Sequence, residues 1–83
     1  PVDFVTFARL REGRKELAKA EQVPAYAIFT NEQLAETAKL LPVYANALSK
    51  IEGVGESRVE KYGGQFLKVL KDEAKIRAAD AKP

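Results

Sequence analysis

The chain has 83 residues and a mass of 9.2 kDa, which is the size of one small domain. It contains no Cys and no His, which excludes disulfides, Cys/His metal sites, thiolate nucleophiles and the commonest proton shuttle at neutral pH. Fourteen basic residues against twelve acidic ones give a net charge of +2, too small to predict nucleic-acid binding by itself.

Nothing in the residue types indicates an enzyme, a metal site or a cofactor site. The carboxylates of the last helix stand beside lysines on a charged face, which is typical of a solvated surface and not of an acid/base pair. No apolar run approaches the ~20 residues of a membrane span, and the amino end lacks the pattern of a signal peptide. Because Pro1 is not an initiator residue, we expect the chain to be a piece of a longer one.

The first half of the chain predicts two helices joined by an apolar connection. Apolar residues at three- and four-residue steps predict a helix over 3–21, and its other face is basic. Pro24 ends that helix, so 23–29 is predicted as a connection, tucked under the fold because it is almost entirely apolar. Thr30 begins a pattern typical of a helix cap, with the second helix running to about Leu41.

The second half predicts three more helices. A short helix over 43–50 leads to the turn at 53–55, in which Val54 is flanked by two glycines and plugs the core. A helix over 56–62 is predicted to end at the Gly63-Gly64 pair, and the last helix spans 65–79 before a frayed end at 80–83. The prediction is therefore one all-α domain over 1–83, a compact bundle of about five helices with its core over 3–79.

Two stretches of this sequence resemble the HRDC domain, named for helicases and the C-terminal part of RNase D. They are the Val23 to Phe29 run (VPAYAIF) and the Gly53-Val54-Gly55 turn followed by Val59 to Gly63 (VEKYG). The resemblance extends from about Phe4 to Leu70, and these motifs are specific when they occur together.

The resemblance implies an intracellular accessory module of a RecQ-type DNA helicase that contributes substrate binding and no catalysis. The expected partner is single-stranded or partly single-stranded DNA, bound weakly and without sequence preference by a monomer. Two alternatives stay open: a regulatory module that docks on the helicase core or on another protein, with little DNA affinity, and the RNA-binding accessory domain of an RNase D-type exonuclease. The near-neutral net charge favours the first of these alternatives.

Tyr26 is the principal candidate contact, because an exposed aromatic ring stacks with any base. A buried ring with a bonded hydroxyl is the alternative interpretation. Basic side chains are expected to neutralise the nucleic-acid backbone; they are Arg14, Lys15, Lys19, Arg58 and Lys61. Arg11 and Arg14 lie next to the apolar stripe, so at least one of them alternatively pairs with a carboxylate and covers the core with its stem.

The Gly53 to Gly55 turn is a further candidate, for a phosphate. It resembles half of a helix-hairpin-helix, in which backbone N–H groups at a helix start hold a phosphate, and Ser57 would add a hydroxyl. Carboxylates on both sides of the turn would repel that phosphate, so a simple packing turn is the favoured interpretation.

Overall fold

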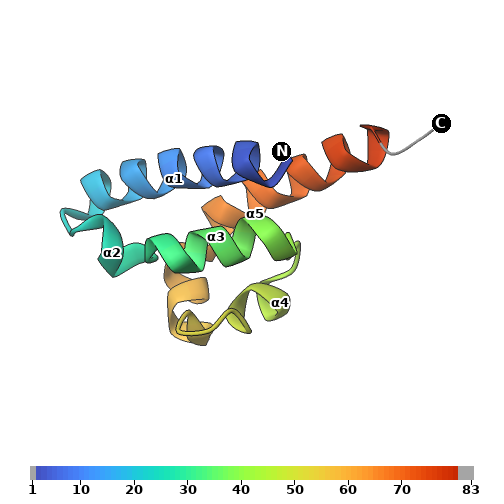
Figure 1. Ribbon diagram of the computed structural model, residues 1–83. Helices are drawn as coiled ribbons and strands as arrows, with labels where there is room; N and C mark the ends of the chain where they lie inside the picture. Colours follow the sequence, from blue (N-terminus) through green and yellow to red (C-terminus); the bar gives the residue numbers. More distant parts are fainter. Residues whose placement is uncertain (1, 81–83) are drawn as a thin grey trace.

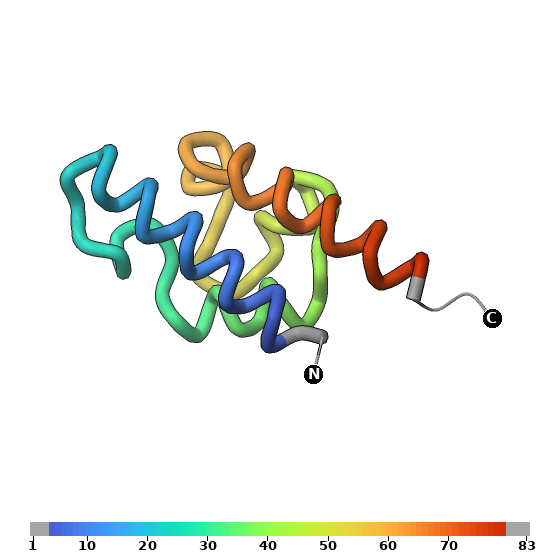
Figure 2. The backbone as a smooth tube through the Cα atoms, turned by 90° about the horizontal axis from the view of Figure 1, so that it is seen from above, coloured from blue at the N-terminus to red at the C-terminus, as the bar shows by residue number. Residues whose placement is uncertain are grey.

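The computed structural model describes residues 2–80, which form five α-helices and no strand (Figure 1). The all-α class and the number of helices are therefore confirmed for this part of the chain. The elements are α1 (Val2–Glu21), α2 (Ala25–Ile28), α3 (Asn31–Leu40), α4 (Ala45–Ser49) and α5 (Gly55–Asp80). The longest helices, α1 and α5, run alongside each other in opposite directions (Figure 2).

Helix α1 contacts α2, α3 and α5, while α4 packs on α5. Two phenylalanines lie at the centre of this arrangement: Phe29 and Phe66 are at most 1% exposed, and their ring centroids lie 4.8 Å apart. The other buried apolar side chains surround this pair, namely Leu10, Ile28, Leu34, Ala38, Leu48, Ile51, Val54, Val59, Tyr62 and Leu70. Helix α5 gives four residues to this core and α3 gives two, whereas α1, α2 and α4 give one each.

The apolar stretch after Pro24 differs in part from its prediction. Residues 25–28 form the single turn of α2 and not an irregular connection, with the Ala27 N–H donating to the Pro24 carbonyl at 3.0 Å. Its predicted burial holds only at its end, because Ile28 and Phe29 are fully buried whereas Pro24 and Tyr26 are exposed. Proline suits the position before a first helical turn, since its missing N–H would have no partner there.

The predicted break at Gly63-Gly64 is wrong, because α5 is continuous from Gly55 to Asp80. The buried residues Val59, Phe66 and Leu70 keep the same helical phase on both sides of the glycines. A Cβ at Gly63 would lie 2.9 Å from Cγ1 of Val59, one turn earlier in α5, whereas its 3.6 Å to Leu48 Cδ2 of α4 would be an ordinary van der Waals contact. Packing therefore overrides the low helix propensity of glycine.

We expect the two adjacent glycines to respond oppositely to alanine. Gly64 has no atom within 4 Å of an added Cβ, so Gly64→Ala should raise the free energy of unfolding by about 0.5 to 1 kcal/mol. At Gly63 the same gain is offset by overpacking against the stiff Val59 side chain, which costs about 1 to 3 kcal/mol. Gly63→Ala should therefore lower the free energy of unfolding. Urea denaturation of both variants measures the difference, and equal stabilisation would contradict the overpacking against Val59.

Helix α3 begins at a reciprocal cap, as the sequence predicts. The Gln33 N–H donates to Thr30 Oγ1 at 3.1 Å, and the Thr30 N–H donates to Gln33 Oε1 at 2.9 Å. Gln33 also donates to the Glu52 carbonyl at 3.4 Å and accepts from Arg58 at 3.1 Å. The start of α3 is thus tied to the segment that leads into α5. Helix α4 is shorter than its predicted 43–50, since Tyr44 at its N-cap gives no side-chain cap.

A polar network joins α1 to α5. The buried carboxylate of Glu73 accepts from Thr6 Oγ1 and from Arg9, both at 3.1 Å. Arg77 donates to Thr6 Oγ1 at 2.9 Å and to the Ala38 carbonyl of α3 at 3.2 Å. Because a buried charge is costly unless it is paired and hydrogen-bonded, this network makes the burial of Glu73 tolerable.

Candidate nucleic-acid interface

Tyr26 is the exposed residue of α2. Its neighbours Ile28 and Phe29 are fully buried and anchor the segment in the core, whereas 69% of Tyr26 is accessible to solvent. A single helical turn cannot bury all its side chains, so the ring that faces away from Ile28 is left in water. The structure therefore excludes the alternative of a buried tyrosine.

A hollow of about 290 Å³ lies between α1 and the beginning of α2. Exposed Arg11 and Lys15, one helical turn apart on α1, line it together with Ala25, the residue before Tyr26. Among residues 2–80, Glu12 is the one carboxylate that lines the hollow, where Arg11, Arg14 and Lys15 supply three cations. Positive charge therefore adjoins the segment that presents the tyrosine, which is the arrangement that a nucleic-acid backbone requires.

Arg14 is placed differently from the other cations of α1. It is 8% exposed, and its Nη1 donates to the Phe29 carbonyl at 3.0 Å, while its Nε has no hydrogen-bond partner among the described residues. Burial, with a smaller contribution from the charge of Arg11, lowers the pKa of Arg14 from its usual value. Arg14 thus holds the end of α2 to α1. It covers the core as the alternative interpretation expected, but its partner is the Phe29 carbonyl and not a carboxylate.

Lys19 is exposed in the last turn of α1, four residues after Lys15. A lysine at this position interacts favourably with the helix dipole whether or not it binds a ligand. Its place on the turn that leads to α2 keeps it in the candidate interface. Arg11 completes the series at 11, 15 and 19, and the four-residue spacing is the sequence signal that points to it.

Arg58 and Lys61 lie on α5 and do not line the α1–α2 hollow. Arg58 is half-buried and its Nη1 is held by Gln33 Oε1. Lys61 is exposed, with its Nζ 5.3 Å from the centroid of the Tyr62 ring. These two cations are therefore not part of the hollow that Arg11 and Lys15 line.

The predicted turn before α5 is confirmed, with positive φ angles of 83° at Gly53 and 70° at Gly55. Val54 is buried between them and fills the core, as expected. Gly55 starts α5 and Ser57 is exposed in its first turn, but Glu52 and Glu56 are exposed beside the same turn. These carboxylates favour a packing role over a phosphate contact.

Within residues 2–80, no group of three or more acidic side chains is arranged to hold a metal ion. No helix in this described part is both long and apolar enough to cross a membrane.

Comparison with known proteins points to one group. The family described as the HRDC domain matches residues 3–70. The chain is 35% identical over 72 residues to the ATP-dependent DNA helicase RecQ of Haemophilus influenzae, covering 87% of this chain and 12% of that protein. It is 39% identical over 70 residues to RecQ of Bacillus subtilis, covering 84% of this chain and 12% of that protein. The chain is 37% identical over 70 residues to the ATP-dependent DNA helicase UvrD2 of Mycobacterium tuberculosis, covering 84% of this chain and 10% of that protein.

The chain spans only about an eighth of the length of the curated relatives it matches, so it corresponds to an accessory domain and not to a complete helicase. The family match covers most of the chain and includes both motifs singled out in the sequence, the apolar run with Tyr26 and the glycine turn. This chain belongs to the HRDC domain family.

Proposed function

We propose that this domain binds single-stranded or partly single-stranded DNA weakly and without sequence preference, and helps to place a parent ATP-dependent DNA helicase on its substrate. Relatives named RecQ and UvrD2 have nearly the same sequence identity to this chain, 39% and 37%, and both are named as ATP-dependent DNA helicases. The likeness therefore supports a helicase parent and gives no preference between these two classes.

The proposal depends on the exposed ring of Tyr26, which follows Ala25 of the basic α1–α2 hollow along the chain. Stacking of one base on an aromatic ring is worth roughly 1 to 3 kcal/mol and tolerates every base, which suits a binder without sequence preference. Arg11, Lys15 and Lys19 would then neutralise the phosphates next to the stacked base. The low net charge of +2 supports weak binding that depends on this one surface.

The remaining candidate cations have different parts in the proposal. Arg14 positions α2 through the Phe29 carbonyl and does not contact the nucleic acid. Arg58 and Lys61 would extend the track onto α5 only for a longer strand, because they lie outside the hollow. The Gly53 to Gly55 turn is left out of the proposed interface, given the carboxylates beside it.

Fluorescence anisotropy of a labelled oligothymidylate tests the proposal and predicts its salt dependence. For single strands, log K falls with log[salt] by roughly 0.7 for each phosphate contact, so three cations predict a slope of about −2. Lys15→Gln should weaken binding and reduce this slope by roughly 0.7. Lys68→Gln removes an exposed lysine of α5 and is the matched control. An equal effect of both substitutions would show that only net charge matters and would contradict the proposed site.

The same titration separates DNA from RNA as the partner. A stacking ring and phosphate-neutralising cations accept both, so discrimination would need a contact to the 2′-hydroxyl. We expect oligothymidylate and oligouridylate to bind with similar affinity to the isolated domain. Strong preference for RNA would instead favour the accessory domain of an RNase D-type exonuclease.

A further inference from the structure

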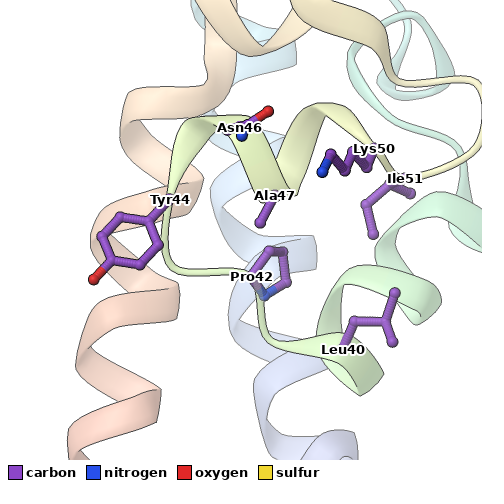
Figure 3. Close-up of a pocket in the computed structure, with 7 residues that line it drawn as sticks. All are labelled: Leu40, Pro42, Tyr44, Asn46, Ala47, Lys50 and Ile51. Carbon is purple, nitrogen blue, oxygen red and sulfur yellow. The ribbon is translucent and has the colours of Figure 1, made fainter.

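A second exposed surface lies away from Tyr26, where α3 ends and α4 begins (Figure 3). A hollow of about 450 Å³ is lined by the apolar side chains of Leu40, Pro42, Ala47 and Ile51, which surround a common space in Figure 3, with Tyr44 at the edge. Leu40 is 61% exposed and Tyr44 is 71% exposed. Large apolar side chains left open around one hollow are typical of an interaction site.

A second hollow of about 730 Å³ adjoins the first, and the two share Leu40, Lys50 and Ile51. We call them together the α3–α4 groove. Its second part is acidic, because Glu32, Glu36 and Glu52 line it and Lys50 is the single cation there in the described part of the chain.

The groove thus carries three negative charges and one positive charge, a local net charge of −2 in a chain whose net charge is +2. Arg58 approaches from α5, but its guanidinium is engaged with Gln33 Oε1 and is half-buried. A nucleic-acid strand or an anionic lipid surface would be repelled from these carboxylates, whereas a cationic ligand would be attracted.

We propose that the α3–α4 groove binds an extended protein segment in which one large apolar side chain, alone or next to a second, is flanked by lysine or arginine. The apolar side chain would enter the hollow formed by Leu40, Pro42, Ala47 and Ile51, and its basic neighbours would face Glu32, Glu36 and Glu52. Apolar burial would supply affinity, and the complementary charges would set specificity and orientation. This proposal is independent of DNA binding at Tyr26, because the two surfaces share no residue.

The test uses the whole 83-residue chain and a fluorescein-labelled peptide, Gly-Lys-Arg-Leu-Phe-Lys-Arg-Gly. Two matched peptides replace either the Leu-Phe pair with Ser-Ser or all four basic residues with Glu. We expect the first peptide to bind with detectable anisotropy change and to shift the amide NMR signals of Leu40, Tyr44, Ala47 and Glu36. Both matched peptides should bind about tenfold more weakly or not at all, as the loss of a central anchor or of charge complementarity implies.

Variants of the chain locate the site. Glu36→Lys and Tyr44→Ala should each weaken binding of the first peptide by about tenfold. Glu16→Lys reverses an exposed carboxylate of α1 and should leave peptide binding unchanged. The proposal is overturned if no peptide binds, if the Ser-Ser peptide binds as well as the first, or if Glu16→Lys acts like Glu36→Lys. Sedimentation that shows a dimer dissociated by Tyr44→Ala would assign the groove to a second copy of the chain instead.

Discussion

Replacement of Tyr26 by alanine is expected to lower the affinity for oligothymidylate by about 5-fold to 150-fold, the equivalent of the roughly 1 to 3 kcal/mol of one stacked base. The free energy of unfolding should change by no more than about 0.5 kcal/mol, because the ring is 69% exposed and the α2 anchors are its buried neighbours. Fluorescence anisotropy at low salt measures the first quantity, and urea denaturation the second.

Tyr44 provides a matched control, since it is another tyrosine of nearly equal exposure, 71%, on a different surface. Tyr44→Ala should leave DNA affinity unchanged, and Tyr26→Phe should retain most of it because stacking needs the ring and not the hydroxyl. If Tyr26→Ala binds as tightly as the unmodified chain, the proposed interface is wrong. If Tyr44→Ala is the variant that fails to bind, the strand occupies the α3–α4 groove, and both proposals for the two surfaces are wrong.

Arg14→Met is expected to lower the free energy of unfolding by about 1 to 3 kcal/mol. Methionine keeps an unbranched stem and a similar helix propensity, but it leaves the buried Phe29 carbonyl without its guanidinium donor. Total stabilities of small domains are only about 5 to 15 kcal/mol, so this loss is large. Urea denaturation followed by circular dichroism measures it.

Its sequence neighbour gives the opposite pattern. Lys15 is exposed and lines the α1–α2 hollow, so Lys15→Met should weaken DNA binding while stability changes by less than about 0.5 kcal/mol. An Arg14→Met protein of full stability whose salt slope has fallen by roughly 0.7 would restore Arg14 to the nucleic-acid contacts that the sequence suggested.

The amino-acid pattern was sufficient for those features whose physical cause is local. Proline after α1, the Thr30 cap and the paired glycines around Val54 each impose a backbone geometry, and all three are present. The exposure of Tyr26 followed from the resemblance and not from periodicity, because a short apolar run does not say which side chain faces the core. The burial of Ile28 and Phe29 fixes which side of the run faces the core and leaves the Tyr26 ring in solvent.

Features that depend on contacts distant in sequence were missed. The glycine pair at 63–64 is a local signal for a helix end, but α4 packs against Gly63 and α5 continues through it. The helical phase shared by Val59 and Phe66 was the available sign of that continuity. The role of Arg14 depends on a carbonyl 15 positions away, and no spacing rule within α1 reveals it.

The contacts between α1 and α5 bear on the order in which the chain folds. Thr6 and Glu73 are 67 positions apart, so their hydrogen bond encloses most of the chain in one loop. The entropy lost on closing such a loop precedes any gain from the contacts, and contacts of long sequence separation slow folding. We therefore expect the contacts between α4 and α5 to form first. The docking of α1 on the C-terminal half of α5 should then limit the folding rate.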